Sequence, residues 1–152
     1  MAVPVRLGVG SVGIRLPVVP KGVSSDGQMA LPPTPDRVGW WRFGSAPDER
    51  GSTVLAGHVD TRRFGIGPLA RLREVEVGDE VALALSDGRT VRYRTVRVRS
   101  IDKQSDALAA VFDEDGPARL HVVTCGGEFD PENGGYQDNV VLTAVPLPRA
   151  DR

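Results

Sequence analysis

The sequence predicts an all-β fold, a closed or nearly closed β-barrel with a few short helices. Glycine (18 residues) and proline (12 residues) are frequent, and only 5% of the residues are aromatic. The apolar residues are largely Val, Leu and Ala, in short runs bounded by turn residues, a pattern typical of strands. We count roughly seven or eight such runs and little helix, which favours a barrel.

Length and charge narrow the classes of protein further. A chain of 152 residues can bury one hydrophobic core, so we expect a single domain over residues 1–152. The formal net charge of -1 provides no basic field, so we expect no nucleic-acid partner. We find no run of about 18 apolar residues, so we expect this chain to be soluble. We also expect it to be a monomer.

The first third of the chain is rich in proline and glycine. Residues 3–7 and 14–19 are short apolar runs that contain or adjoin prolines, so we expect edge strands, where a missing N–H is tolerated. Residues 24–28 predict a turn and residues 31–36 a surface loop. In the extended segment 38–43, Trp40 and Trp41 must point to opposite sides, so either both pack in the protein or one of them, for which we name Trp41, lines a groove.

The middle of the chain contains the clearest hairpin. Residues 53–56 predict a buried strand, residues 61–67 a loop and residues 68–72 a short helix that begins at Pro68. Residues 80–85 and 90–94 flank a Ser-Asp-Gly-Arg turn and predict a β-hairpin. The apolar parity changes along the second strand, which indicates a bulge between residues 94 and 96 and places its arginines on a solvated face.

The last third combines strands with polar connections. Asp106 can cap a short helix over residues 107–112, followed by a loop at 113–117. Residues 118–125 predict a strand that ends on Cys125, followed by Gly126. We then expect a polar loop at 128–135 and a final strand at 136–145.

Cys125 is the candidate nucleophile, because a thiol at a strand end beside a histidine can attack a carbonyl. His121 is on the same strand, but four residues at about 3.3 Å each place it roughly 13 Å away. His58 ends another strand and could meet the thiol at the barrel rim, so we choose His58. The alternative from the residues alone is a buried structural cysteine and a satisfied loop histidine. One cysteine and two histidines lack the spacing of zinc sites, so we expect no metal and no cofactor.

Several segments together resemble the sortase family. The segments that carry the resemblance are Thr-Val-Leu-Ala-Gly-His-Val-Asp (53–60), Thr-Cys-Gly-Gly (124–127), Tyr-Gln-Asp-Asn-Val-Val (136–141), Pro-Val-Val-Pro (17–20), Val-Gly-Trp (38–40) and Leu-Arg-Glu-Val-Glu-Val-Gly-Asp-Glu-Val (72–81). They cover nearly the whole chain. The likeness is closest to the class F or E sortases of high-GC Gram-positive bacteria.

The resemblance implies an eight-stranded sortase barrel and a cysteine transpeptidase. Such an enzyme cleaves an LPXTG-like sorting signal of surface proteins between Thr and Gly, through a thioacyl-enzyme. It then transfers the acyl group to an amine of peptidoglycan or of a pilin. Cys125 would attack, and His58 would protonate the departing amine and later help to deprotonate the incoming one.

The chain departs from the family pattern at one position. The third catalytic residue of the family is an arginine, and the position that aligns with it is Gln137, a neutral donor. We expect Arg119 to point away from the thiol on the opposite side of its strand, which makes it a poor substitute. Gln137 therefore leaves open a rival function, an inactive domain that binds sorting signals. A third alternative is a thiol peptidase that releases the acyl group to water.

The resemblance also names supporting residues and a location. The candidate supporting or substrate-binding residues are Asp60, Thr124, Gly126, Trp41, Tyr136 and Asn139. Family members act at the outer face of the cell membrane or in the cell wall, held by an N-terminal helix. We find no such helix in the sequence, so we expect this chain to be the catalytic domain without its anchor.

Overall fold

The computed structural model describes residues 2–25, 29–61, 65–102, 110–113, 115–130 and 135–148; for residues 60, 61, 65, 102, 125–130 and 135–138 it describes the backbone only. The strands are β1 (Pro4–Val9), β2 (Ile14–Lys21), β3 (Val38–Trp41), β4 (Ser52–Gly57), β5 (Asp60–Thr61), β6 (Gly65–Ile66), β7 (Glu80–Leu85), β8 (Thr90–Asp102), β9 (Arg119–Asp130) and β10 (Gly135–Pro146). Two 3-10 helices, η1 (Gly10–Val12) and η2 (Pro68–Glu74), lie between them.

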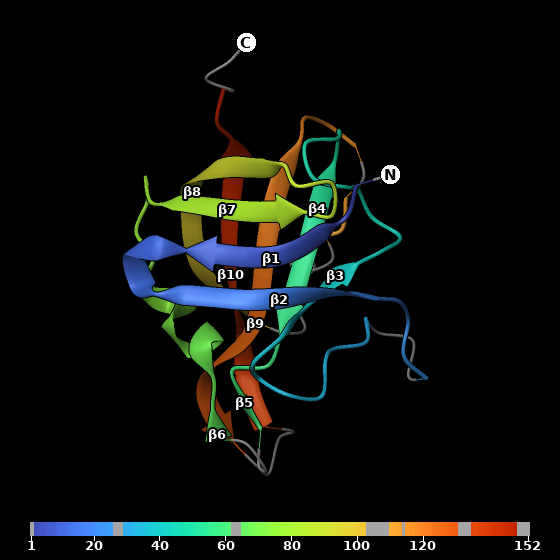
Figure 1. Cartoon of the computed structure of the whole chain (residues 1–152). Coiled ribbons are helices and arrows are strands. Elements are labelled where there is room, and N and C mark those ends of the chain that lie inside the picture. The colour runs from blue at the N-terminus through green and yellow to red at the C-terminus, as the bar shows by residue number, and fades with distance from the viewer. Residues whose placement is uncertain are drawn as a thin grey trace.

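Eight of these strands close into a barrel, as the sequence predicts. Their order around the barrel is β1-β2-β3-β4-β9-β10-β8-β7 (Figure 1), and β5 and β6 form a separate two-stranded sheet. The prediction that β1 and β2 are edge strands is wrong, because β1 pairs with both β2 and β7, and β2 also pairs with β3. Barrel closure leaves no edge, and the register shift between Pro4 and Arg6 accommodates the first proline instead.

The central hairpin and its bulge are confirmed. β7 and β8 pair from Ala84↔Thr90 onwards, and Gly88 takes a positive φ of 90° in the turn between them. On the other side of β8, Thr143 pairs with Arg97 whereas Ala144 pairs with Thr95, so Val96 is the extra residue of the bulge. The helix at residues 68–72 is also confirmed, as η2.

Two predicted loops are partly strand. Residues 61–67 contain the ends of β5 and β6, and β9 runs on to Asp130 because β10 pairs with it up to Gly135. Residues 107–109 of the helix expected over 107–112, and residues 26–28 of the turn expected at 24–28, lie outside the described residues; Ala110 is helical and residues 111–112 form a turn. Residues 110–113 lead out of that segment, and Val111 is buried.

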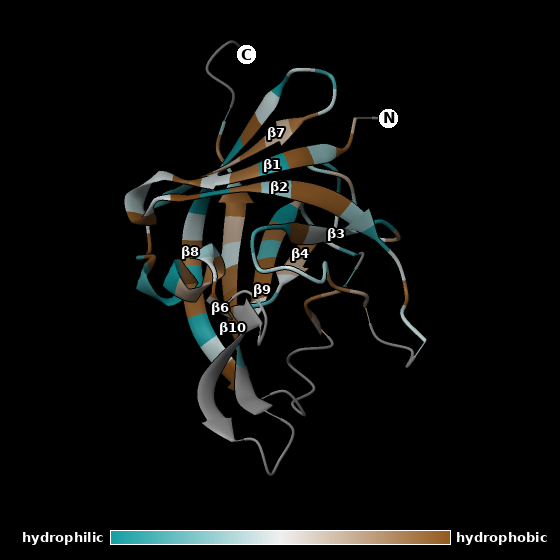
Figure 2. Cartoon of the chain, turned by 60° about the horizontal axis from the view of Figure 1, so that its bottom comes forward, coloured by the Kyte–Doolittle hydropathy of each residue, from teal (hydrophilic) through white to brown (hydrophobic). Residues whose placement is uncertain are grey.

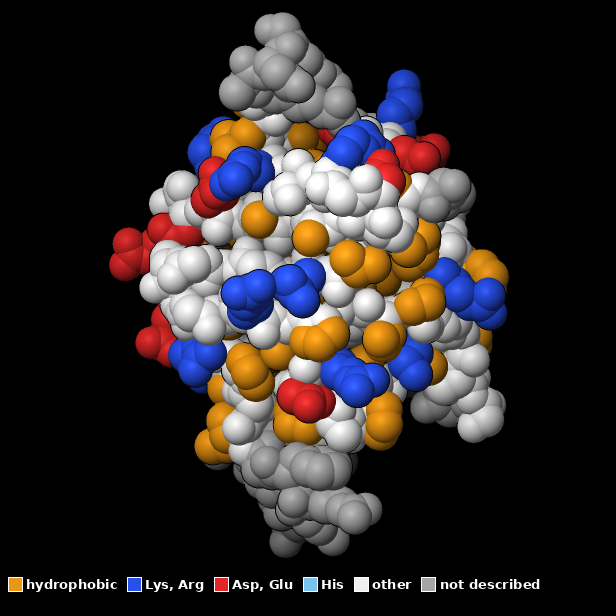
Figure 3. Space-filling view, in the orientation of Figure 1, with side chains coloured by type: hydrophobic (Ala, Val, Ile, Leu, Met, Phe, Trp, Pro, Cys, Tyr) orange, Lys and Arg blue, Asp and Glu red, His pale blue; other side chains and the backbone are white. Residues whose placement is uncertain are grey.

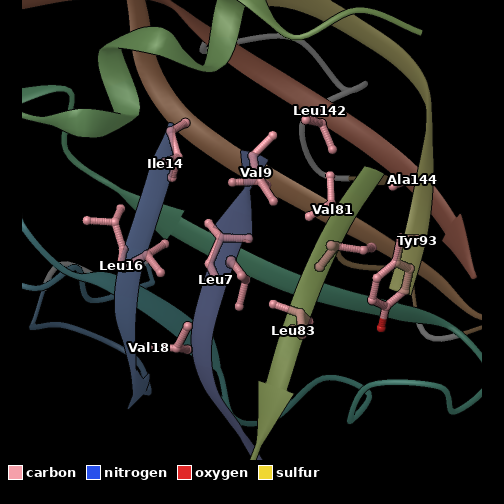
Figure 4. Close-up of a cluster of buried hydrophobic side chains, with 14 of the residues drawn as sticks. Leu7, Val9, Ile14, Leu16, Val18, Val81, Leu83, Tyr93, Leu142 and Ala144 are labelled. Atoms are coloured by element: carbon pink, nitrogen blue, oxygen red, sulfur yellow. The ribbon is translucent and has the colours of Figure 1, made fainter. Parts of the chain in front are cut away.

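The barrel interior is filled by the alternate apolar positions of the strands (Figure 4). Leu7, Leu83 and Leu142 are among its fully buried members, together with the ring of Tyr93. η2 adds Leu69 and Leu72 to the same core. Because successive residues of a strand point to opposite faces, the other alternate set lies on the outside of the barrel; Figure 2 shows this alternation of hydropathy along β8.

A second apolar cluster covers part of that outer surface. It is built on the outward positions of four neighbouring strands, with Val54 and Ala56 on β4, Val123 on β9, Val141 on β10 and Ile101 on β8. Val111, Phe112, Met29, Leu31 and Trp41 pack over it. We call these ten residues the outer cluster.

The opposite side of the barrel has a mixed surface. Figure 3 shows basic and acidic side chains scattered among apolar and small ones over β1, β2 and β7. No helix in the described part of the chain is long and apolar enough to span a membrane.

Candidate functional site

The positions of the predicted catalytic pair lie where the pairing of β4 with β9 ends; both strands run toward the bottom of Figure 1. These two strands run parallel, and their last paired residues are Gly57 and Thr124. His58 and Cys125 directly follow the two members of this last pair, and neighbouring strands of a sheet lie about 4.8 Å apart. The fold therefore brings together two backbone positions that are 67 residues apart in the sequence. The side chain of His58 is half-buried, whereas that of Cys125 lies outside the described part.

The alternation of the strands assigns both positions to the outside of the barrel. Ala56 and Val123 belong to the outer cluster, and positions 58 and 125 each follow them by two residues. The pair thus lies at one end of the outer cluster rather than in the barrel core.

Thr124 and Gly57 are tied to each other directly. The Thr124 hydroxyl donates a hydrogen bond of 2.9 Å to the Gly57 carbonyl, and Thr124 is 2% exposed. A Cβ at Gly57 would lie 2.7 Å from Leu69 Cδ1, so any larger residue at this position requires the surrounding packing to shift. Backbone packing against η2 and a side-chain hydrogen bond to β9 therefore fix the residue before His58.

The position of Gln137 lies one strand further, on β10. In the register of β10 and β9, Asn139 pairs with Cys125 and Asp138 with Gly126. Gln137 falls in the register shift between Tyr136 and Asp138, two residues from the position opposite Cys125. Several predicted site residues have side chains outside the described part, so their roles stay predictions. They are Asp60, Cys125, Tyr136 and Gln137, and only the backbone of Gly126 is described.

His121 is a structural residue in this fold. It is 7% exposed, and its Nδ1 lies 3.0 Å from Thr143 Oγ1 on the neighbouring strand. Burial lowers the pKa of His121 to about 4, and the charges of Arg119, Arg97 and Arg99 act in the same direction. A neutral, hydrogen-bonded histidine about 13 Å along the strand from Cys125 is unsuited to act on the thiol.

The expectation for Arg119 was wrong in one respect. Arg119 precedes Cys125 by an even number of residues and shares the outward set of Val123, so the two positions are on the same side of β9. Its guanidinium is nevertheless engaged elsewhere: Nη1 donates to the carbonyls of Asp115 and Pro117, both at 2.9 Å, and Nη2 to that of Asp113 at 3.1 Å. Arg119 holds the connection between β8 and β9, six residues from the thiol.

The two tryptophans separate as the extended segment predicts. Trp40 is 5% exposed in the barrel core, and its Nε1 donates to the Ser45 carbonyl at 3.4 Å. Trp41 is half-buried on the outer cluster, edge-on to Phe43 and Phe112 with ring centroids 5.2 and 5.8 Å away. Sequence reasoning missed Phe112, because its contact with Trp41 joins segments distant in sequence.

Among the described residues, no group of three or more His, Cys, Asp or Glu side chains is placed to hold a metal ion. A cysteine thiol beside a histidine, at the end of an apolar surface, is the combination that nucleophilic attack on a bound carbonyl compound requires.

Comparisons with known proteins agree with this architecture. A curated relative, Sortase D of Bacillus subtilis (strain 168), is 34% identical over 90 residues, which are 58% of this chain. The match spans 40% of that relative's length.

Solved structures share the fold. The Sortase D5 transpeptidase of Clostridium perfringens superposes with a TM-score of 0.70 at 14% identity, over 97% of this chain and 79% of that one. Sortase C2 of Group B Streptococcus Pilus Island 1 gives 0.70 at 17% identity, over 94% and 73%. A sequence profile of the sortase domain matches residues 7–147. Because this profile covers most of the sequence, the chain belongs to the sortase family.

Proposed function

We propose that the chain is a cysteine transpeptidase that cleaves an LPXTG-like sorting signal between Thr and Gly. It would transfer the acyl group to an amine of peptidoglycan or of a pilin. The observation that carries the proposal is the parallel pairing of β4 and β9, which ends at Gly57 and Thr124 and makes the positions of His58 and Cys125 neighbours.

The chemistry follows from the two side chains. The Cys125 thiolate attacks the threonine carbonyl, the C–N bond to glycine breaks, and His58 gives a proton to the departing amine. The thioester then reacts with an incoming amine, which loses its proton to His58, and Cys125 is released. Neutral donors near the carbonyl, for which we name Gln137 and Asn139, would stabilise the oxyanion.

The apolar surface beside the pair suits a peptide with hydrophobic residues. Trp41 and Phe112 lie on the outer cluster, half-buried and in edge contact. We assign this surface to the side chains of the sorting signal that precede the scissile bond. Asp60, Tyr136 and Gly126 stay candidates for contacts around the carbonyl, and membership in class F or E is part of the same proposal.

Gln137 supports a second function, an inactive domain that binds sorting signals. A glutamine amide carries no fixed charge and no guanidinium fork. Loss of one oxyanion donor typically costs about 10² to 10³ in rate. A third function, a peptidase that gives the acyl group to water, differs only in the acceptor.

The test is peptide exchange followed by mass spectrometry. The protein is incubated with an LPXTG peptide and a primary amine, and we expect the Thr–amine product. Cys125→Ala and His58→Ala should abolish it, whereas His121→Gln, a change in the other histidine, should retain it when the variant is folded. Absence of both product and thioester across the pH range would exclude an active enzyme, and tight peptide binding without turnover would favour the binding domain. Product that stays hydrolysed despite added amine would favour the peptidase.

The proposed place of action is the outer face of the cell membrane or the cell wall, with the domain acting as a monomer. Family membership supports the proposed location, and the monomeric state is a proposal of its own. Fractionation of cells that produce the full-length protein, and sedimentation of this domain, test them.

A further inference from the structure

One side-chain hydrogen bond joins the two residues that directly precede the proposed catalytic pair. Thr124 Oγ1 donates to the Gly57 carbonyl at 2.9 Å. Thr124 belongs to the inward set of β9 with Leu120 and Val122, so its hydroxyl lies in the barrel wall, away from any substrate on the outer cluster. The bond is additional to the backbone ladder of the sheet.

The acceptor of this bond is part of the peptide unit that carries His58. A peptide unit is planar, so the direction of the Gly57 carbonyl also fixes the His58 N–H and Cα. The donor is the residue directly before Cys125. The hydrogen bond therefore sets the separation of the two backbone positions from which the histidine and the thiol extend.

Packing restrains Gly57 on its remaining sides. A Cβ at Gly57 would meet Leu69 Cδ1 at 2.7 Å, the Arg37 carbonyl at 3.3 Å and Val38 Cα at 3.6 Å. η2 and the start of β3 thus hold the Gly57 backbone, while Thr124 holds its carbonyl toward β9. Without the hydroxyl, the Gly57 carbonyl loses this hydrogen bond to β9.

We propose that Thr124 is a positioning residue, which sets the distance and orientation of His58 relative to Cys125 through the Gly57 carbonyl. The inference rests on the proposed function, since it assumes that His58 and Cys125 act together. A shift of about 1 Å in a catalytic group can cost about 10² in rate, so loss of the bond should affect turnover more than substrate binding.

The experiment compares Thr124→Val, which keeps the shape and removes the donor, with Thr124→Ser, which keeps the hydroxyl. Thr143→Val is the matched control, because Thr143 is also buried and makes a cross-strand hydrogen bond of 3.0 Å, to His121. Cys125 is the only cysteine, so its alkylation by iodoacetamide can be followed against pH without a sorting signal. The same variants are assayed for kcat, KM and Tm.

We expect Thr124→Val to lower kcat about 10- to 100-fold with little change in KM. Its alkylation profile should move from that of the wild type toward that of His58→Ala, and Thr124→Ser should restore both. Thr143→Val should lower the Tm about as much as Thr124→Val does, and it should leave the alkylation profile and kcat unchanged.

Two results would overturn the inference while the proposed function stands: a Thr124→Val variant with wild-type kcat and alkylation profile, or a Thr143→Val variant with the same kinetic loss. If the wild type and His58→Ala alkylate identically and neither turns over peptide, the pair itself is refuted, and the positioning role with it.

Discussion

A methyl group added at Gly57 tests how tightly the base of the site is packed. In Gly57→Ala the new Cβ would lie 2.7 Å from Leu69 Cδ1, about 1 Å inside an ordinary carbon–carbon contact. Leu69 is fully buried in the barrel core and cannot swing into solvent. η2, β4 or both must therefore move, and His58 follows Gly57 directly.

The magnitude is the difference of two effects. Overpacking typically costs about 1–3 kcal/mol, and replacing a strand glycine by alanine returns about 0.5–1 kcal/mol. We expect a net loss of about 1–2 kcal/mol, equivalent to a fall in Tm of about 2–8 °C for a domain of this size. Displacement of His58 should lower the rate of peptide transfer by up to about 10²-fold at temperatures where the variant is folded.

Calorimetry measures the loss of stability, and the transfer assay measures the loss of rate. Two further variants test whether both losses come from the contact with Leu69. Gly8→Ala is the control, because the nearest atom to its Cβ, the Ala82 carbonyl, is 4.0 Å away; it should be neutral or slightly stabilising. Leu69→Val removes the δ-methyl groups, so Gly57→Ala should cost much less in that background. Equal losses from Gly57→Ala in both backgrounds, or a Tm at the wild-type level, would refute the packing argument.

Three further outcomes are expected. The pKa of His121 is lowered from 6.5 to about 4 in the folded state, so protonation of this residue favours the unfolded chain. The free energy of unfolding should be highest above pH 6.5 and fall by up to about 3 kcal/mol as the pH drops toward 4. Urea titrations of His121→Gln should lack most of this fall. In Arg119→Lys one ammonium nitrogen replaces the two guanidinium nitrogens, of which Nη1 serves Asp115 O and Pro117 O and Nη2 serves Asp113 O, so the Asp113 contact should weaken. The Ser52 amide, which donates to Asp113 O at 3.0 Å, should then exchange with deuterium faster than in the wild type, with an opening free energy lower by about 1–2 kcal/mol. Gln137→Arg should raise the transfer rate by up to about 10² to 10³, and an unchanged rate with tight peptide binding would favour the binding domain.

The barrel was predictable because its local signals agree with one another. The Ser-Asp-Gly-Arg turn fixes the β7–β8 hairpin, and the change of apolar parity at Val96 marks the bulge that the structure contains. The strand before His58 was equally local, since an apolar run precedes Gly57, the last residue of β4. The expectation that the next strand ends on Cys125 was wrong, because β9 continues to Asp130 through its pairing with β10. Each of these signals lies within a few residues of the feature that it predicts.

The features that sequence reasoning missed depend on contacts between distant segments. Nothing near β1 shows that it pairs with β7 as well as β2, so the prolines suggested an edge that barrel closure removes. Phe112 gives no sign that its ring meets Trp41, and Gly57 gives none that η2 packs on its backbone. The sequence shows that residue 124 carries a hydroxyl, but it does not show that the Gly57 carbonyl accepts its hydrogen bond.

The parallel pairing of β4 and β9 explains why this barrel can hold a two-residue site at all. In an antiparallel pair, the ends of the two strands lie at opposite ends of the barrel, so residues that follow them cannot meet. β4 and β9 are parallel in a sheet that is otherwise antiparallel except for β2 and β3, and both therefore deliver the residue after their last pair to the same end. β10 then returns antiparallel to β9, which brings the start of its strand, with Asn139 opposite Cys125, to that end as well. The positions proposed for the base, directly after β4, for the nucleophile, on β9, and for neutral donors, on β10, are thus brought together by the pairing of backbones. On the proposed function, the residue at position 137 therefore alters the chemistry of the site without altering the strand pairing that assembles it.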